Sequence, residues 1–149
     1  MCKSLKFGKD IKTKGNRVRV TNTRNKTSTK LIWAGHAKKE YIKWWRDYSK
    51  FDMVSIKADS FEENGVQFKL DEESWIYGIQ LGKDVEINGK IIGRERELFL
   101  LTREARTKTE KKVHDRWPLV FSKDDPEMRL FESEDITGDN NDGQSEDET

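Results

Sequence analysis

The chain has 149 residues, of which 33% are hydrophobic and 38% are charged, and its formal net charge is only +1. This length allows one hydrophobic core, but the apolar fraction is low for a fully ordered domain, so we expect a folded body and a solvated segment. A single cysteine excludes a disulfide framework and a cysteine-based zinc cluster. Without a secretory signal or a run of ~18 apolar residues, we expect an intracellular protein, cytoplasmic or nuclear, without membrane contact.

The charges are strongly segregated along the chain. Residues 1–50 hold 15 lysines and arginines against 3 aspartates and glutamates, residues 51–117 hold 12 against 14, and residues 118–149 hold 2 against 11. A polarity of this kind indicates a charged partner. A basic segment so poor in acids favours a nucleic-acid-binding surface.

Strand patterns begin near the N-terminus. Residues 1–16 mix lysines with a few apolar residues and predict a basic arm or a first strand. Residues 17–23 alternate, with Val18 and Val20 on one face and arginines on the other, which is typical of a half-buried strand with a basic outer face. A polar turn leads into a second strand over residues 29–33, so we expect a hairpin with a basic tip.

The stretch from Ala34 to Phe51 predicts an amphipathic helix. At about 100° per residue, one arc collects apolar and aromatic side chains and the opposite side collects cations. Ile42 is apolar but lies off this arc. We expect the arc to pack on the core and the basic stripe to face an anion. The residues of the arc are Ala37, Tyr41, Trp44, Trp45, Tyr48 and Phe51.

Patterns of period two continue after the helix. They cover residues 51–58, 66–70, 75–81 and 97–102. Asn88-Gly89 is the strongest hairpin signal in the chain. Short strands at this spacing, with glycine-containing turns, predict a small barrel that is closed or nearly closed. Further on, residues 102–113 predict a short, basic surface helix, and residues 117–121 predict an apolar segment that fastens the end of the fold to the core.

Together these patterns predict an α+β protein. Its body is a small, mostly antiparallel β-barrel with one principal amphipathic helix, and an OB-like order is one alternative because the helix follows the third strand. The predicted parts are an arm or first strand over residues 1–16, an α+β domain over residues 17–121, and an acidic tail over residues 122–149. The tail has too few apolar residues to offset chain entropy, so we expect it to be disordered.

The clustered cations of the N-terminal third predict a surface that contacts nucleic-acid phosphates. Such contacts release counterions, so binding would weaken as the salt concentration rises. Solubility alone does not require such a thorough exclusion of acids. The predicted phosphate-contacting residues are Arg17, Arg19, Arg24, Lys26, Lys30, Lys39, Lys43, Arg46 and Lys50.

Aromatic side chains bear on the kind of nucleic acid. Single strands are held by rings that stack on bases beside a basic groove. Because the rings of the predicted helix lie on its apolar arc, the strand residues Trp33, Trp75 and Tyr77 are the better stacking candidates. We therefore expect single-stranded DNA or RNA to be slightly preferred.

The acidic tail has three interpretations. It is solubilising disorder, an internal competitor that folds over the basic groove, or a docking segment for a basic partner protein. A basic barrel followed by an acidic flexible tail resembles the general plan of single-stranded DNA-binding proteins, especially phage ones. The resemblance is one of layout, and it implies non-catalytic binding with a tail that modulates binding or docks partners.

The residues predict no catalytic, metal or cofactor site. His36 and Glu40 share a helical face and His114 and Asp115 are adjacent, but isolated pairs of this kind are usually surface or capping residues. Two other functions stay open. One is a viral or phage-type regulatory protein that binds a host transcription or replication protein. The other is a small nuclease that uses the two histidines as acid and base, or a carboxylate such as Asp52.

Overall fold

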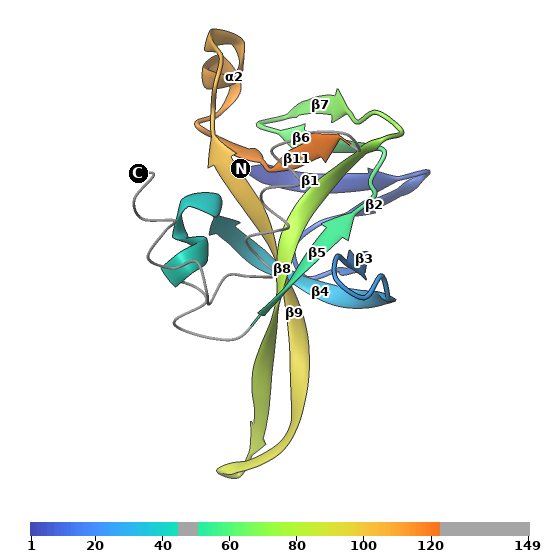
Figure 1. The fold of residues 1–149 in the computed structure, drawn as a ribbon, viewed down its shortest axis with the longest axis vertical. Helices are drawn as coiled ribbons and strands as arrows, with labels where there is room; N and C mark the ends of the chain where they lie inside the picture. Colours follow the sequence, from blue (N-terminus) through green and yellow to red (C-terminus); the bar gives the residue numbers. More distant parts are fainter. Residues whose placement is uncertain (45–50, 123–149) are drawn as a thin grey trace.

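A closed, five-stranded β-barrel forms the body of the protein (Figure 1). The computed structural model describes residues 1–44 and 51–122, and within them the structure is mostly β with only short helices. Around the barrel each strand hydrogen-bonds to the next, and the last pairs with the first. In this order the strands are β9 (Lys90–Glu104), β4 (Ser28–Lys38), β3 (Arg17–Asn22), β5 (Phe51–Ile56) and β8 (Ser74–Ile87).

The barrel is mixed, because one of its pairings is parallel. β4 and β9 run in the same direction, and the other neighbours around the barrel are antiparallel. The predicted small barrel is therefore confirmed. The short helical turn follows β4, which is the second barrel strand along the chain.

A second, four-stranded sheet lies at the end of the barrel away from the long β8–β9 hairpin (Figure 1). Its pairings are all antiparallel. Two short strands, β10 (Arg116–Pro118) and β11 (Val120–Ser122), pair with β9 and β8 respectively. The strands of the second sheet, in spatial order, are β2 (Asp10–Lys12), β1 (Cys2–Phe7), β6 (Ser60–Glu63) and β7 (Val66–Lys69).

The barrel interior and the second sheet share one hydrophobic core. Alternation along β3 buries Val18 and Val20, as predicted, and Trp33 of β4 is fully buried beside them. From the second sheet, Leu5 of β1 and Phe61 of β6 belong to the same cluster. β1 is therefore an integral strand of the fold and not a loose basic arm.

A second hydrophobic cluster contains residues of β5, β8 and β9 that do not belong to the first cluster. On β8 it takes Ile79 and Leu81. Leu119 and Phe121 from the end of the fold are buried in it, so the predicted fastening segment is confirmed. Ile42 joins the cluster from the helical turn after β4.

β8 and β9 continue past the barrel as a two-stranded arm (Figure 1). Asn88 and Gly89 connect the strands with φ values of 53° and 78°, the left-handed conformation that an Asn-Gly hairpin turn requires. The predicted hairpin is confirmed. Near the tip a register shift leaves an extra residue on β9. Ile87, Ile91 and Ile92 are exposed there.

The predicted helix from Ala34 to Phe51 is wrong over its first part. Residues 34–38 are the end of β4, and their parallel pairing with β9 holds them in an extended conformation. A short 3-10 turn, η1 (Lys39–Tyr41), follows, and helical residues begin at Ile42. Pairing with a strand some sixty residues away thus overrides the local helical periodicity.

The predicted apolar arc is also inverted where the structure describes it. Tyr41 and Trp44, which were expected in the core, are 54% and 57% exposed. Ile42, which lay off the arc, is buried. Ala37 is buried as expected, but as a strand residue. Tyr41 and Trp44 therefore lie at the surface and not in the core.

Some predictions fall on residues outside this description. Trp45, Tyr48 and the acidic tail beyond Ser122 are among them. Over residues 1–44 and 51–122, no helix has both the length and the apolar character needed to cross a membrane.

Gly78 provides a test of how the barrel closes. A Cβ at this position would lie 2.9 Å from Leu98 Cδ1 and 2.9 Å from the backbone oxygen of Phe99 on the paired strand. Because paired backbone cannot move aside cheaply, we expect Gly78→Ala to lower the free energy of unfolding by about 1–3 kcal/mol in urea denaturation. Gly35→Ala is the matched control, since its Cβ would meet only the Phe99 ring, at 3.3 Å. Equal losses in the two variants would contradict this account.

Candidate nucleic-acid interface

The outer face of the β3–β4 hairpin is basic and free of acids. Alternation along β3 turns Arg17 and Arg19 toward solvent, as predicted. The antiparallel register places Arg19 directly opposite Lys30 of β4. None of the residues on this face is a carboxylic acid. The outward positions of the two strands are Arg17, Arg19, Thr21, Ser28, Lys30 and Ile32.

Arg19 and Lys30 repel each other in this register. Like charges directly opposite one another on neighbouring strands destabilise a sheet by a few tenths of a kcal/mol to about 1 kcal/mol. The guanidinium of Arg19 is oriented by a hydrogen bond that Nη1 donates to Ser28 Oγ at 3.0 Å. An anion placed between the two cations would remove the repulsion, so the geometry suits a phosphate.

The tip of the hairpin holds two more predicted residues, Arg24 and Lys26. The Asn22 side chain shapes the turn by accepting hydrogen bonds from the backbone N–H groups of Arg24 (2.9 Å) and Asn25 (3.2 Å). Arg24 also forms an ion pair with Asp52 of β5 at 2.7 Å. This contact offsets the charge of Arg24 and engages the carboxylate considered for a nuclease. Lys26 is exposed in the turn.

The other predicted cations lie at the far end of β4. Lys39 and Lys43 are half-buried on the turn that follows the strand. From Lys30 to Lys38 the strand advances about 26 Å at ~3.3 Å per residue. The structure therefore divides the predicted surface into two groups. Arg46 and Lys50 lie outside the described residues.

Burial removes two of the three predicted stacking residues. Trp33 is 0% exposed, and its indole N–H donates to a backbone oxygen of its own strand at 3.1 Å. Tyr77 is 3% exposed and meets Phe121 edge to face. Neither ring is available to a base, so these two predictions are wrong. Trp75 is half-buried, and the Lys57 ammonium lies 5.1 Å from its ring centroid.

The exposed rings are ones that helical periodicity assigned to the core. Tyr41 and Trp44 are three residues apart on the turn after β4, and the Lys38 ammonium lies 5.7 Å from the Tyr41 ring centroid. Two aromatic residues at this spacing between lysines were the signal available in the sequence. The prediction of a continuous helix packed on the core assigned both rings to the interior, and this concealed the signal.

The arginines of the C-terminal part are matched to carboxylates. Arg103 makes two hydrogen bonds to Glu110 (2.9 and 3.0 Å) on α2 (Lys108–Val113), and these lower the pKa of Glu110 to about 2. Arg116 binds Glu40 in the same bidentate way at 2.7 and 3.0 Å and lowers its pKa as well. Arg103 and Arg116 therefore serve the fold.

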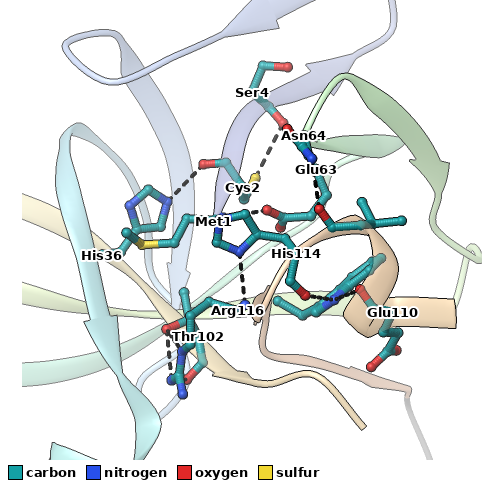
Figure 2. A network of polar contacts seen from close by, with 12 residues as sticks. Met1, Cys2, Ser4, His36, Glu63, Asn64, Thr102, Glu110, His114 and Arg116 are labelled. Carbon is teal, nitrogen blue, oxygen red and sulfur yellow. Dashed lines mark hydrogen bonds and ion pairs between the residues drawn. The ribbon is translucent and has the colours of Figure 1, made fainter. Parts of the chain in front are cut away.

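Both histidines take part in a network of structural contacts (Figure 2). Burial lowers the pKa of His36 to about 4, and the neutral ring donates from Nε2 to the backbone oxygen of Cys2 at 2.9 Å. His114 accepts a hydrogen bond at Nδ1 from the N–H of Arg116, also at 2.9 Å. Each ring thus has a nitrogen committed to the fold. Among the described residues, no three His, Cys, Asp or Glu side chains are grouped to hold a metal ion.

A buried carboxylate lies in the same network. Glu63 is fully buried, and its Oε1 lies 2.6 Å from the amino nitrogen of Met1 (Figure 2). Burial raises the pKa of Glu63, and the Met1 amino group opposes that shift. Burial also raises the pKa of the Cys2 thiol to about 12, so this cysteine is protonated at neutral pH and is not a nucleophile.

Comparison with known proteins adds no family to these observations. No protein-family model, no curated protein and no solved structure matches the chain.

His36 makes stability depend on pH. Its pKa is 6.5 in an unfolded chain and about 4 in the fold, so between these values the unfolded chain binds a proton that the folded chain does not. The stabilising contribution of neutral His36 is therefore complete above pH 6.5 and is lost as the pH falls toward 4. We expect urea denaturation to show that wild type loses more stability than His36→Gln between pH 7 and 4.5. Parallel pH profiles for the two proteins would contradict this.

Proposed function

We propose that the protein binds nucleic acid through the outer face of the β3–β4 hairpin and catalyses no reaction on it. The observation that carries the proposal is the placement of Arg19 opposite Lys30 on an exposed face without acids. Elsewhere, as in the Arg24–Asp52 pair, cations of the fold meet carboxylates. A cation pair that lowers stability is best explained by an anionic ligand.

The arrangement suits a polymer of phosphates better than one small anion. Arg17 and Arg19 are two residues apart on β3, which separates their Cα atoms by about 7 Å. Lys30 lies beside them, and Lys26 extends the basic face to the tip of the hairpin. The cations thus form a row along the hairpin and do not surround a single pocket. Contacts of this kind are salt-dependent and do not read sequence.

Lys30→Glu separates binding from stability. Because the new carboxylate would lie opposite Arg19, we expect the free energy of unfolding to rise by a few tenths of a kcal/mol to about 1 kcal/mol. Affinity for an oligonucleotide should fall in an anisotropy titration. For Lys30→Gln, which removes one phosphate contact, the slope of log affinity against log salt should decrease by about 0.7–0.9.

The matched control is Lys108→Glu, which changes an exposed lysine on α2, a helix that lies apart from the β3–β4 hairpin (Figure 1). It should leave affinity and salt slope close to those of wild type. A wild-type protein that binds no oligonucleotide, or binds without salt dependence, would overturn the proposal. So would a Lys30→Glu variant that binds as tightly as wild type.

The β8–β9 arm favours a second candidate function, which is docking to a protein. Ile87, Ile91 and Ile92 are exposed near its tip, and exposed apolar patches mark interaction sites. Residues 82–96 hold four lysines and arginines against three aspartates and glutamates, so the arm has little net charge. A neutral arm with an apolar tip suits a protein partner, such as the host transcription or replication protein of a regulator.

Replacing Ile91 and Ile92 by Thr tests the docking function. Threonine keeps the β-branched shape that strands favour but weakens apolar contacts. Wild-type protein should capture a defined partner from nuclease-treated extract, and the double variant should lose it while keeping its oligonucleotide affinity. Partners that disappear on nuclease treatment, or that the variant retains, would remove this candidate.

A further inference from the structure

Two aromatic rings project from the short helical turn that follows β4. Tyr41 is the last residue of η1 and Trp44 lies three positions further on, in helical conformation. Residues at this spacing share a face of a helical segment. Both side chains are more than half exposed, at 54% and 57%. Two large rings that remain more than half exposed are unusual for a structural role, because fuller burial of each would stabilise the fold.

The turn that carries the rings is firmly held. Ile42, between them in sequence, is buried in the outer hydrophobic cluster. On the other side, Glu40 binds the guanidinium of Arg116 through two hydrogen bonds of 2.7 and 3.0 Å. Arg116 in turn donates to the backbone oxygen of Thr102 on β9 at 2.8 Å. The rings are thus displayed from a base that is anchored at two points, and little ordering is needed before they bind a ligand.

A cation lies beside the rings. The Lys38 ammonium is 5.7 Å from the Tyr41 ring centroid. The acid of the turn, Glu40, is already matched by Arg116. A shallow hollow of about 300 Å³ adjoins Lys38. Its lining residues are Lys38, Glu104, Ala105, Lys111, Asp115 and Arg116.

We propose that Tyr41 and Trp44 stack on unpaired bases of single-stranded nucleic acid, with Lys38 placed to contact an adjacent phosphate. This proposal rests on the proposed nucleic-acid function and names the form of nucleic acid preferred. In a duplex the faces of the bases are covered by their neighbours, whereas in a single strand they are free to stack on a protein ring. Rings beside lysines match that ligand, since one part takes the base and the other the phosphate.

The test compares Tyr41→Ala and Trp44→Ala with wild type. The probes are a single-stranded oligothymidylate of about 15 nucleotides, within the known footprint range of such sites, and a duplex of the same length. We expect each variant to lose roughly 5-fold to 100-fold in affinity for the single strand, which is the loss that removal of one stacking ring gives. Affinity for the duplex should change less than twofold. Tyr41→Phe and Trp44→Phe, which keep a ring, should bind the single strand nearly as wild type does.

Ile11→Ala is the matched control, because it also truncates an exposed apolar side chain but lies on the second sheet. It should leave both affinities unchanged, and thermal denaturation should show that all variants fold. Equal losses for single strand and duplex, or no loss for either, would overturn base stacking while leaving β3–β4 binding intact. If wild type binds neither probe, the nucleic-acid function itself fails, and the effect of Lys30→Glu distinguishes these cases.

Discussion

The parallel pairing of β4 with β9 is the constraint on which the other features depend. It closes the barrel, and it requires β4 to remain extended as far as Lys38. A bulge between Trp33 and Gly35 places one extra residue in β4. The Trp33 side chain before the bulge is buried, and the strand continues beyond the bulge. The chain can turn only after Lys38, so the helical segment begins at the end of the barrel and buries Ile42 there. Tyr41 and Trp44 are left outside as a direct result of where the strand ends.

Charge is used in two distinct ways in this fold. The ion pairs of Arg24, Arg103 and Arg116 hold turns and loops in place, and an exposed pair such as Arg24–Asp52 contributes at most about 1 kcal/mol. Arg19 and Lys30 do the opposite, since they bring like charges together at a cost of similar size. The cations of the first 50 residues therefore do not form one uniform surface. A contribution to stability explains the arginines that bind carboxylates. It does not explain why Arg19 lies opposite Lys30, because that arrangement lowers stability.

Local patterns in the sequence predicted the elements that depend on neighbours close in the chain. The alternation around Val18, the Asn88-Gly89 turn and the apolar end around Phe121 all follow from period two or turn chemistry. Barrel closure was expected only in general terms, because no local pattern shows that residues 34–38 pair with a strand sixty positions later. Without that pairing the spacing of aromatic residues favours a helix. The same missing information reversed the assignment of Trp33, which is buried, and of Trp44, which is more than half exposed.

The two proposed sites differ in the physics of binding, and the difference sets what each can contribute. Cations on β3–β4 act on phosphates, so their effect falls with salt and is alike for single strands and duplexes. Rings act on base faces, so their effect depends little on salt and requires unpaired bases. Because Ile42 and the Glu40–Arg116 pair already fix the rings, little of the stacking energy is spent on ordering the turn. In the proposed binding mode, discrimination between nucleic-acid forms would therefore have its physical basis in the turn after β4, whereas the hairpin would supply attraction without discrimination.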